Sequence, residues 1–299
     1  MEKFQLQPRD RGAYKEHPMV VPHMTLDEYG PKLKDFFTFK RSDNGILEAK
    51  WHTQGKELLW SVQVHRAIWQ ACMYIGQDMD NEVLILGGTG DQWIAGLDDY
   101  NSMNEEENID WMTYEHMYYD GTNISEGLVC DIEIPTIGVI NGPGFHTEMA
   151  LFCDLTLMAE DAYIVDMHYN INMVPGDGIQ IALRECMGLK RSNYMMLMGQ
   201  PINAKTALEY GMVNEVLPRE KIYDRAWEIA EKLMISASRA TRRVTVQILR
   251  APWKKAFAWE LRHAFGSEMF TTLTQKPTHE DKFWKEKKEK VAQEMERSE

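Results

Sequence analysis

Apolar runs and helical patterns alternate along the middle of the chain. The segments at residues 82–88 and 135–142 are apolar almost throughout, and two more such runs follow at residues 154–160 and 162–167. Strands that are apolar at nearly every position are buried on both faces, as in a sheet covered by helices on its two sides. The pattern therefore predicts an α/β protein.

Turn and capping residues mark the ends of several expected elements. Two alternating runs flank the turn at residues 43–45, which predicts a β-hairpin over residues 36–54. Ser61 precedes a pattern with one apolar face and is a suitable helix N-cap. Asn203 and Gly211 bound a short helix that a strand follows.

Composition divides the chain into four segments. Residues 1–33 are polar and contain several prolines, so we expect an extension that wraps a neighbour or is partly disordered. Residues 34–218 carry the strand pattern, and residues 219–275 are helical in pattern. Residues 276–299 form a charged tail, which is typical of a solvated helix or a frayed end.

Charge and cysteine content narrow the classes of partner. The formal net charge of the 299 residues is −13, which disfavours nucleic acid, because binding phosphates requires clusters of Lys and Arg. Four cysteines lie far apart without CxxC spacing, so we expect reduced thiols. No apolar run resembles a signal peptide or a membrane span, and we expect a cytoplasmic protein that does not bind membranes.

Common catalytic motifs are missing from the sequence. The histidines show neither HExxH nor His/Cys ligand spacing, so we expect no metal ion. The segment at residues 87–92 is glycine-rich but lacks the lysine of a phosphate-binding loop. There is no GxSxG elbow, which disfavours a serine hydrolase.

His168 and Asp177 stand nine residues apart, and the turn "VPGDG" at residues 174–178 can reverse the chain between them. An imidazole with a pKa of about 6.5 can accept a proton at neutral pH. A carboxylate on its far nitrogen would fix its tautomer. The residues alone leave a second interpretation open, in which His168 is a structural histidine and Asp177 caps a helix.

Several segments in combination resemble the enoyl-CoA hydratase/isomerase (crotonase) superfamily. They are "VLILGGTGDQWIAGLDDYN", "IPTIGVINGPGFHTEMALFCDLTLMAEDAYIVDM", "VPGDG" and "ALEYGMVNEVLP", in this order between residues 36 and 270. The resemblance implies a spiral of ββα units in residues 34–218 with two roughly perpendicular sheets. It further implies a helical trimerisation region at residues 219–275 and a homotrimer or a dimer of trimers.

The departures from that family concern its two catalytic glutamates. By the resemblance, Ala150 holds the position of the first glutamate and His168 that of the second, which implies that the chain is not an ordinary hydratase. The segment "WHTQGKELLWSVQVH" at residues 51–65, His146 after Asn-Gly-Pro, and "VPGDG" are similar to the 6-oxocamphor hydrolase-like β-diketone hydrolases. Those enzymes cleave a carbon–carbon bond by a retro-Claisen reaction without a cofactor.

That resemblance implies three catalytic residues. His168 would be the general base and Asp177 would orient it. His146 would donate a hydrogen bond to the carbonyl oxygen that becomes the enolate. An ordinary histidine at a helix terminus is the alternative for His146.

The resemblance also implies a substrate-binding set. Trp60 and His65 would form a pocket wall, and Glu268 would orient His65 or His146. Leu97 and Thr147 would give their backbone N–H groups to an oxyanion hole. Core packing is the alternative for Trp60, and a solvent-facing helical position is the alternative for Glu268.

The expected activity is hydrolysis of a small-molecule, cyclic β-diketone to a keto acid. One alternative is an acyl-CoA thioesterase, hydrolase or lyase that uses the same His–Asp pair, with "SRATRRV" at residues 238–244 as a candidate basic cluster. A second alternative is a non-catalytic scaffold. Three histidines and an aspartate at the hydrolase positions argue against the scaffold.

Overall fold

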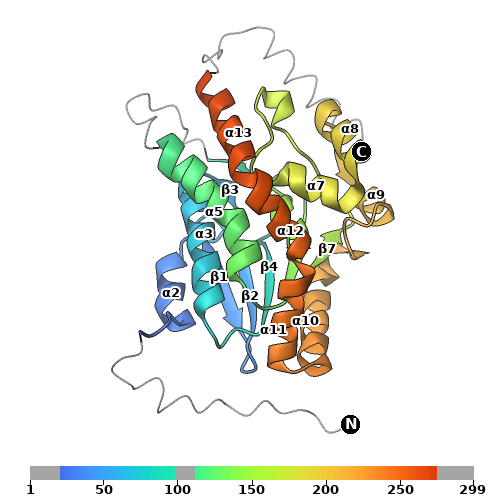
Figure 1. Cartoon of the computed structure of the whole chain (residues 1–299). Helices are drawn as coiled ribbons and strands as arrows, with labels where there is room; N and C mark the ends of the chain where they lie inside the picture. Colours follow the sequence, from blue (N-terminus) through green and yellow to red (C-terminus); the bar gives the residue numbers. More distant parts are fainter. Residues whose placement is uncertain (1–20, 99–111, 275–299) are drawn as a thin grey trace.

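The computed structural model describes residues 21–98 and 112–274 (Figure 1). Its centre is a six-stranded sheet with the order β1-β2-β4-β6-β7-β10. The strands are β1 Phe37–Arg41, β2 Ile46–Trp51, β4 Val83–Gly88, β6 Thr136–Ile140, β7 Leu155–Ala159 and β10 Glu215–Leu217. Only the β1–β2 pair is antiparallel in this sheet. The predicted α/β class is confirmed, and every position of β4 and β6 is buried.

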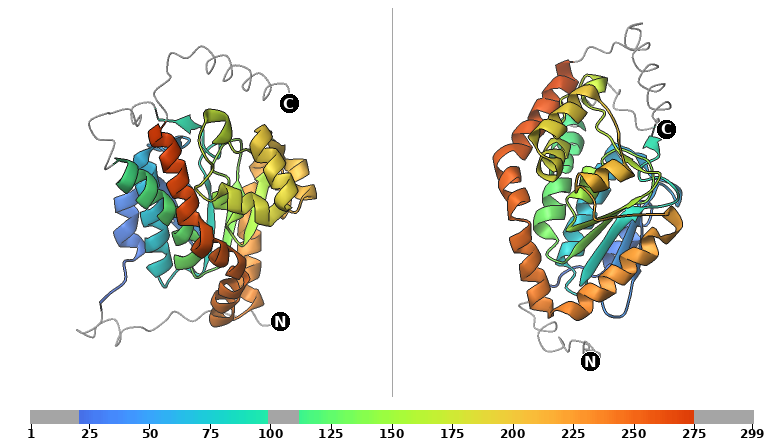
Figure 2. Two further views of the ribbon diagram at one scale, coloured as in Figure 1. Left: turned by 45° about the horizontal axis from the view of Figure 1, so that its top comes forward. Right: turned by 90° about the vertical axis from the view of Figure 1, so that its right-hand side faces the viewer.

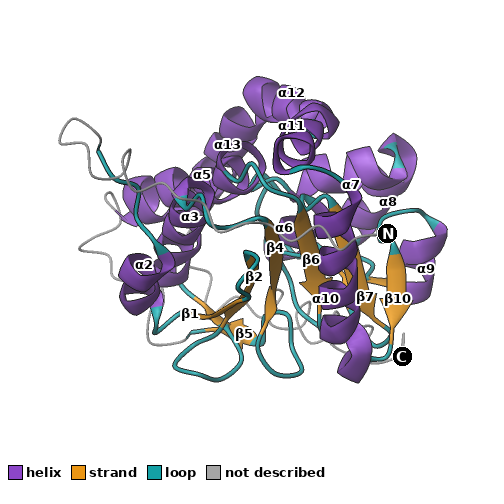
Figure 3. Cartoon of the chain, turned by 90° about the horizontal axis from the view of Figure 1, so that it is seen from below, coloured by secondary structure: helices purple, strands orange, loops and turns teal. Residues whose placement is uncertain are grey.

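Helices cover both faces of this sheet. Figures 2 and 3 show α3, α5 and α13 on one side of it and α10 across the other. The described helices are α2 Leu26–Leu33, α3 Val62–Gln77, α5 Asp120–Glu126, α6 Glu148–Leu151, α7 Ile179–Met187, α8 Leu189–Met198, α9 Ala204–Glu209, α10 Arg219–Ser236, α11 Arg239–Leu249, α12 Ala251–Ala256 and α13 Arg262–Thr274. Short π-helical segments lie at Met112–Tyr119, Gly127–Asp131 and Phe257–Leu261, and a 3-10 turn lies at Tyr169–Ile171.

Two small strand pairs hold the loops around the sheet. β3 (Leu59–Trp60) pairs in parallel with β5 (Gly96–Leu97), and β8 (Tyr163–Ile164) pairs antiparallel with β9 (Ile202–Asn203). The first pair places Trp60 directly beside Leu97. The second pair fixes the chain just before the loop that carries His168.

The capping and turn predictions are confirmed. Gly45 has φ +93° in the β1–β2 hairpin, where a side chain would also collide with the backbone of Asp80. Ser61 Oγ accepts a hydrogen bond from the Val64 amide at the start of α3. Asn203 caps α9 in the same way.

The N-terminal extension differs from our expectation where it is described. Helix α2 lies within it, and its Tyr29 and Leu33 side chains are buried in the chain's own core. The pattern was difficult to recognise because Pro31 lies inside this helix. The expectations for residues 1–20 and 276–299 lie outside the described residues.

The described cysteines are all free, and Cys130 is the one exposed thiol among them. Over residues 21–98 and 112–274, none of the helices combines the length and the apolar character that a membrane span requires.

Candidate active site

Side chains from four separate segments converge beyond the ends of β6 and β8. His146 and Glu148 follow β6, His168 follows β8, Asp177 precedes α7, and Glu268 comes from α13. Each of these five side chains is at least 86% buried, since the exposed fractions run from 3% to 14%. A cluster of ionisable groups buried to this degree is costly unless its members neutralise one another.

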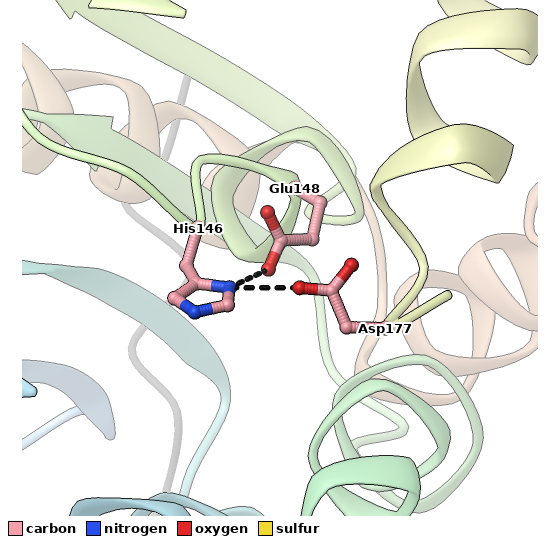
Figure 4. Close-up of side chains that lie close together, drawn as sticks. All are labelled: His146, Glu148 and Asp177. Carbon is pink, nitrogen blue, oxygen red and sulfur yellow. Dashed lines mark hydrogen bonds and ion pairs between the residues drawn. The ribbon is translucent and has the colours of Figure 1, made fainter. Parts of the chain in front are cut away.

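His146 lies between two carboxylates (Figure 4). Its Nδ1 atom is 3.0 Å from Glu148 Oε1 and 2.9 Å from Asp177 Oδ2. The residue has φ +55°, a left-handed conformation that is uncommon for a residue with a side chain and that often occurs at functional sites. Its backbone carbonyl accepts a hydrogen bond from Trp93 Nε1 at 3.2 Å, which helps to hold this conformation.

His168 has a different partner from the one we predicted. Its Nδ1 atom lies 2.7 Å from Asp166 Oδ1, and the Asp166 side chain is 1% exposed. Asp177 is 3.8 Å from the other nitrogen, Nε2, and Glu268 Oε1 is 3.7 Å from it. Asp166 therefore orients the ring, whereas Asp177 and Glu268 face its Nε2 edge.

Asp177 both supports the start of a helix and faces the histidines, which the sequence had left as alternatives. Its Oδ1 accepts a hydrogen bond from the Ile179 amide at 3.1 Å, as a residue at a helix start does. Its Oδ2 faces His146 and, at a longer distance, His168. One carboxylate therefore supports α7 and lies between the two rings.

Carboxylates dominate the proton affinity of both histidines. Burial opposes the charged form of His146, but Glu148 and Asp177 outweigh it and raise the pKa to about 10. Burial also opposes charge on His168, where Asp177, Asp166 and Glu268 raise the pKa to about 10. Both rings are therefore imidazolium at neutral pH in the ligand-free protein.

The acids of the cluster diverge in their proton affinity. Burial and the neighbouring Asp177 raise the pKa of Glu268 to about 8, and the same two causes raise the pKa of Glu148. Although burial opposes ionisation of Asp177, His168 and His146 hold its pKa below the usual range. Asp177 is thus the ionised centre of the cluster, and Glu148 and Glu268 take up protons more readily.

These proton affinities predict how stability depends on pH. The folded-state pKa values of His146 and His168, about 10, exceed the unfolded value of about 6.5, so the folded protein binds more protons between these limits. The stabilisation is complete below the unfolded pKa and is lost as pH rises through the folded pKa. We expect the melting temperature to fall from pH 7 to pH 10 in scanning calorimetry at constant ionic strength. A flat or rising curve would contradict this.

Trp60 and His65 form one wall beside His146. The Trp60 ring stacks on His146 with ring centroids 4.2 Å apart, and it meets His65 edge-on at 4.8 Å. Burial lowers the pKa of His65 to about 3, so this ring is neutral. The structure brings all three side chains together, and Trp60 is 8% exposed.

The other expected binding residues lie in different settings. Thr147 is fully buried directly before α6, and Leu97 is 67% exposed in β5. Contrary to our expectation, Glu268 orients neither His65 nor His146. Instead its Oε2 accepts a hydrogen bond from the Gly176 amide at 3.0 Å, and it is not solvent-facing.

Two carboxylates of the site were missed in the sequence. We took the first family glutamate to be replaced at Ala150, but Glu148, two positions earlier, faces His146. Ala150 is fully buried and packs against Gly138 of β6. Asp166 likewise stands two positions from His168. In both cases one residue separates the histidine from its acid, so the patterns HxE and DxH were the available signals.

The cluster also has a geometry that metals can use. The ligand atoms of His146, Glu148 and Asp177 lie within 4.8 Å of one another, and so do those of His168, Asp177 and Glu268. Around His146 the charges can balance without a metal, because the protonated ring faces the carboxylates of Asp177 and Glu148 at 2.9 and 3.0 Å.

The basic segment that we considered for coenzyme A is engaged elsewhere. Arg239 and Arg242 both form ion pairs with Glu82, at 3.0 and 2.6 Å, and the Arg242 side chain is 4% exposed. Arg243 donates a hydrogen bond to the Asn81 carbonyl. These arginines attach α11 to the loop before β4.

Comparison with known proteins places these observations in a family. A family model described as enoyl-CoA hydratase/isomerase matches residues 57–292. Hydroxycinnamoyl-CoA hydratase-lyase of Pseudomonas fluorescens is 26% identical over 64% of this chain and 70% of its own length. Short-chain-enoyl-CoA hydratase of Clostridium acetobutylicum is 28% identical over 66% of this chain and 76% of its own.

A solved structure extends the comparison to other chemistry. A β-diketone hydrolase from the cyanobacterium Anabaena sp., bound to (S)-3-oxocyclohexyl acetic acid, is 33% identical to this chain with a TM-score of 0.75. The match covers 82% of this chain and 96% of that one. The resemblance and the fold expected from the sequence are thereby confirmed.

Proposed function

Since the chain belongs to the enoyl-CoA hydratase/isomerase (crotonase) family, we propose that it is a hydrolase that cleaves a carbon–carbon bond of a cyclic β-diketone. Its only co-substrate is water, and the product is a keto acid. The observation that carries the proposal is the buried pair of imidazoles, each flanked by carboxylates, beside the indole of Trp60. The 33% identical β-diketone hydrolase supports the choice of substrate class.

His168 and its acids would activate the water. The Nε2 atom faces Glu268 Oε1 and Asp177 Oδ2 across 3.7 and 3.8 Å, a separation at which a water molecule can bridge polar groups. The ring becomes a base when its Nε2 proton moves to the ionised form of Glu268, a form whose share grows as pH rises through the Glu268 pKa of about 8. Asp166 keeps Nδ1 protonated and the ring oriented during this exchange.

The bond changes balance with water alone. Nε2 of His168 takes a proton from water, and the hydroxide adds to one carbonyl carbon. The tetrahedral oxyanion then collapses to the carboxylic acid, and the carbon–carbon bond breaks. Its electron pair forms an enolate on the second carbonyl. That oxygen would accept a hydrogen bond from His146, and the proton held by His168 returns to the enolate carbon.

Acyl-CoA chemistry is the second candidate. Two observations favour it: the curated relatives act on CoA thioesters by name, and a glutamate of α6 faces the site after all. Against it stands the engagement of the arginines at residues 239–243 in internal contacts. Calorimetry with an enoyl-CoA and with free coenzyme A separates the two candidates.

The direct test is turnover. We expect the purified protein to convert bicyclic and monocyclic β-diketones to keto acids without added cofactor, followed by loss of the diketone absorbance and by mass spectrometry of the product. Reaction in ¹⁸O-labelled water should place one labelled oxygen in the new carboxylate. Turnover of an enoyl-CoA with no diketone hydrolysed would overturn the proposal in favour of the second candidate.

We also propose that the chain forms a homotrimer or a dimer of trimers and is cytoplasmic. Large apolar side chains of the C-terminal region are exposed in the single chain, among them Ile248 at 68%, Trp259 at 89% and Phe270 at 67%. We expect contacts between chains to cover part of this exposed apolar surface. Light scattering on the purified protein measures the number of chains.

A further inference from the structure

We propose that Glu148 is a positioning residue for His146. It would hold the ring's orientation and positive charge so that the Nε2–H group serves the enolate oxygen throughout the reaction. The inference deepens the proposed function, on which the role of the Nε2–H group rests.

The geometry around Nδ1 carries the first step. Glu148 Oε1 is 3.0 Å from this atom, and Asp177 Oδ2 is 2.9 Å from it. Figure 4 shows both carboxylates on the Nδ1 edge of the ring and Nε2 turned away from them. A single N–H proton is therefore offered to two acceptors, which leaves Nε2 as the edge that can meet a ligand.

The second step concerns which acid serves which ring. Asp177 faces both histidines, at 2.9 Å from His146 and 3.8 Å from His168. Glu148 forms its hydrogen bond with His146, and its Oε2 atom has no hydrogen-bond partner among the described residues. Proton transfer at His168 changes the charge of the ring that faces Asp177 Oδ2, and Asp177 also faces His146. In its ionised form Glu148 gives His146 a counter-charge that is separate from Asp177 during that transfer.

The third step is the cost of placing an acid there. Glu148 is 3% exposed, and a carboxyl group buried with an unpaired oxygen destabilises the fold. A glutamine could make the same single hydrogen bond without the charge. The position at the start of α6 gives the side chain a short, fixed path to the ring, because only Thr147 separates the two residues.

Several other groups face His146 and set the background for its titration. His65 of α3, His168 after β8 and Glu268 of α13 all lie close enough to interact electrostatically with it or to contact its ring. The first two oppose a positive charge on His146 when they are protonated, and Glu268 favours it when ionised. None of these three contacts the Nδ1 edge that Glu148 occupies, so the Glu148 contribution can be isolated by substitution.

The test uses Glu148→Gln, with exposed Glu160→Gln as the matched control. In nitrogen-15 NMR of histidine-labelled, ligand-free protein, we expect the pKa of His146 to fall by about one unit or more in E148Q, because a nearby opposite charge is removed. The control should titrate as the wild type does. Glu148→Asp keeps the charge and should restore part of the shift.

Kinetics give the second readout. On a β-diketone, E148Q should lower kcat by roughly 10- to 1,000-fold with little change in KM, and the loss of activity at alkaline pH should begin at lower pH. Unchanged titration of His146 in folded E148Q would overturn the inference, and so would an unchanged kcat. If no diketone is turned over while the NMR shift occurs, the proposed function fails but the control of the ring by Glu148 stands.

Discussion

Replacing Asp177 with asparagine should lower kcat on a β-diketone by roughly 10²- to 10⁴-fold, because this carboxylate supports both the proposed base and the group that binds the enolate. The carboxylate faces both imidazoles, at 2.9 Å from His146 Nδ1 and 3.8 Å from His168 Nε2. Its removal lowers the pKa of both rings, because each loses an opposite charge. One substitution therefore alters the base and the enolate-binding group together.

The asparagine variant retains the shape of the site. Its amide oxygen can still accept the hydrogen bond from the Ile179 amide that Asp177 Oδ1 receives. Exposed Asp43→Asn, in the β1–β2 turn, is the matched control and should keep wild-type kinetics. The assay compares kcat and KM for the three proteins, with circular dichroism to verify folding. An Asp177→Asn variant that is folded and retains more than a tenth of the wild-type kcat would remove Asp177 from the mechanism.

The second large effect is expected for His168→Ala. Loss of the proposed base should lower kcat/KM by roughly 10²- to 10⁴-fold, the usual contribution of a positioned acid or base. The residual rate of product formation by this variant should rise with hydroxide concentration, because the solvent must then deprotonate the attacking water. Stopped assays between pH 6 and pH 10 measure this dependence.

The alanine variant leaves buried acids without their cation. Asp166 loses its 2.7 Å partner, and Asp177 and Glu268 lose the charge between them, so the fold is destabilised. His168→Gln keeps a hydrogen-bonding side chain in that space and gives the same kinetic test in a better-packed variant. His263→Ala, at an exposed position of α13, is the control. Full activity of both His168 variants would exclude this histidine as the base.

Local patterns were sufficient for several elements of the fold. Apolar runs predicted β4 and β6, the Asp-Asn-Gly turn predicted the first hairpin, and Ser61 and Asn203 predicted helix starts. These features depend on neighbours within a few residues, so their signals survive in the linear chain. The helix at Leu26–Leu33 was missed because its proline obscured a pattern that burial against α3 and β1 stabilises.

Local patterns did not predict which acid pairs with which histidine. Residue identity and resemblance indicated His146, His168 and Asp177, but the sequence assigned Asp177 to His168 as its orienter. The folded chain gives that position to Asp166 and brings Asp177 to His146. It also turns Glu148 into the site, although we had predicted no role for this residue from the sequence.

The sequence by itself determined the α/β class, the family and the three residues His146, His168 and Asp177 as candidates for the site. Periodicity, caps and motif order are properties of the linear chain. Only the tertiary structure decided which carboxylate faces which ring nitrogen, and therefore which groups are charged. That decision depends on ångström-scale distances between loops after β6, after β8 and before α7, and on burial that strengthens every charge–charge interaction among them.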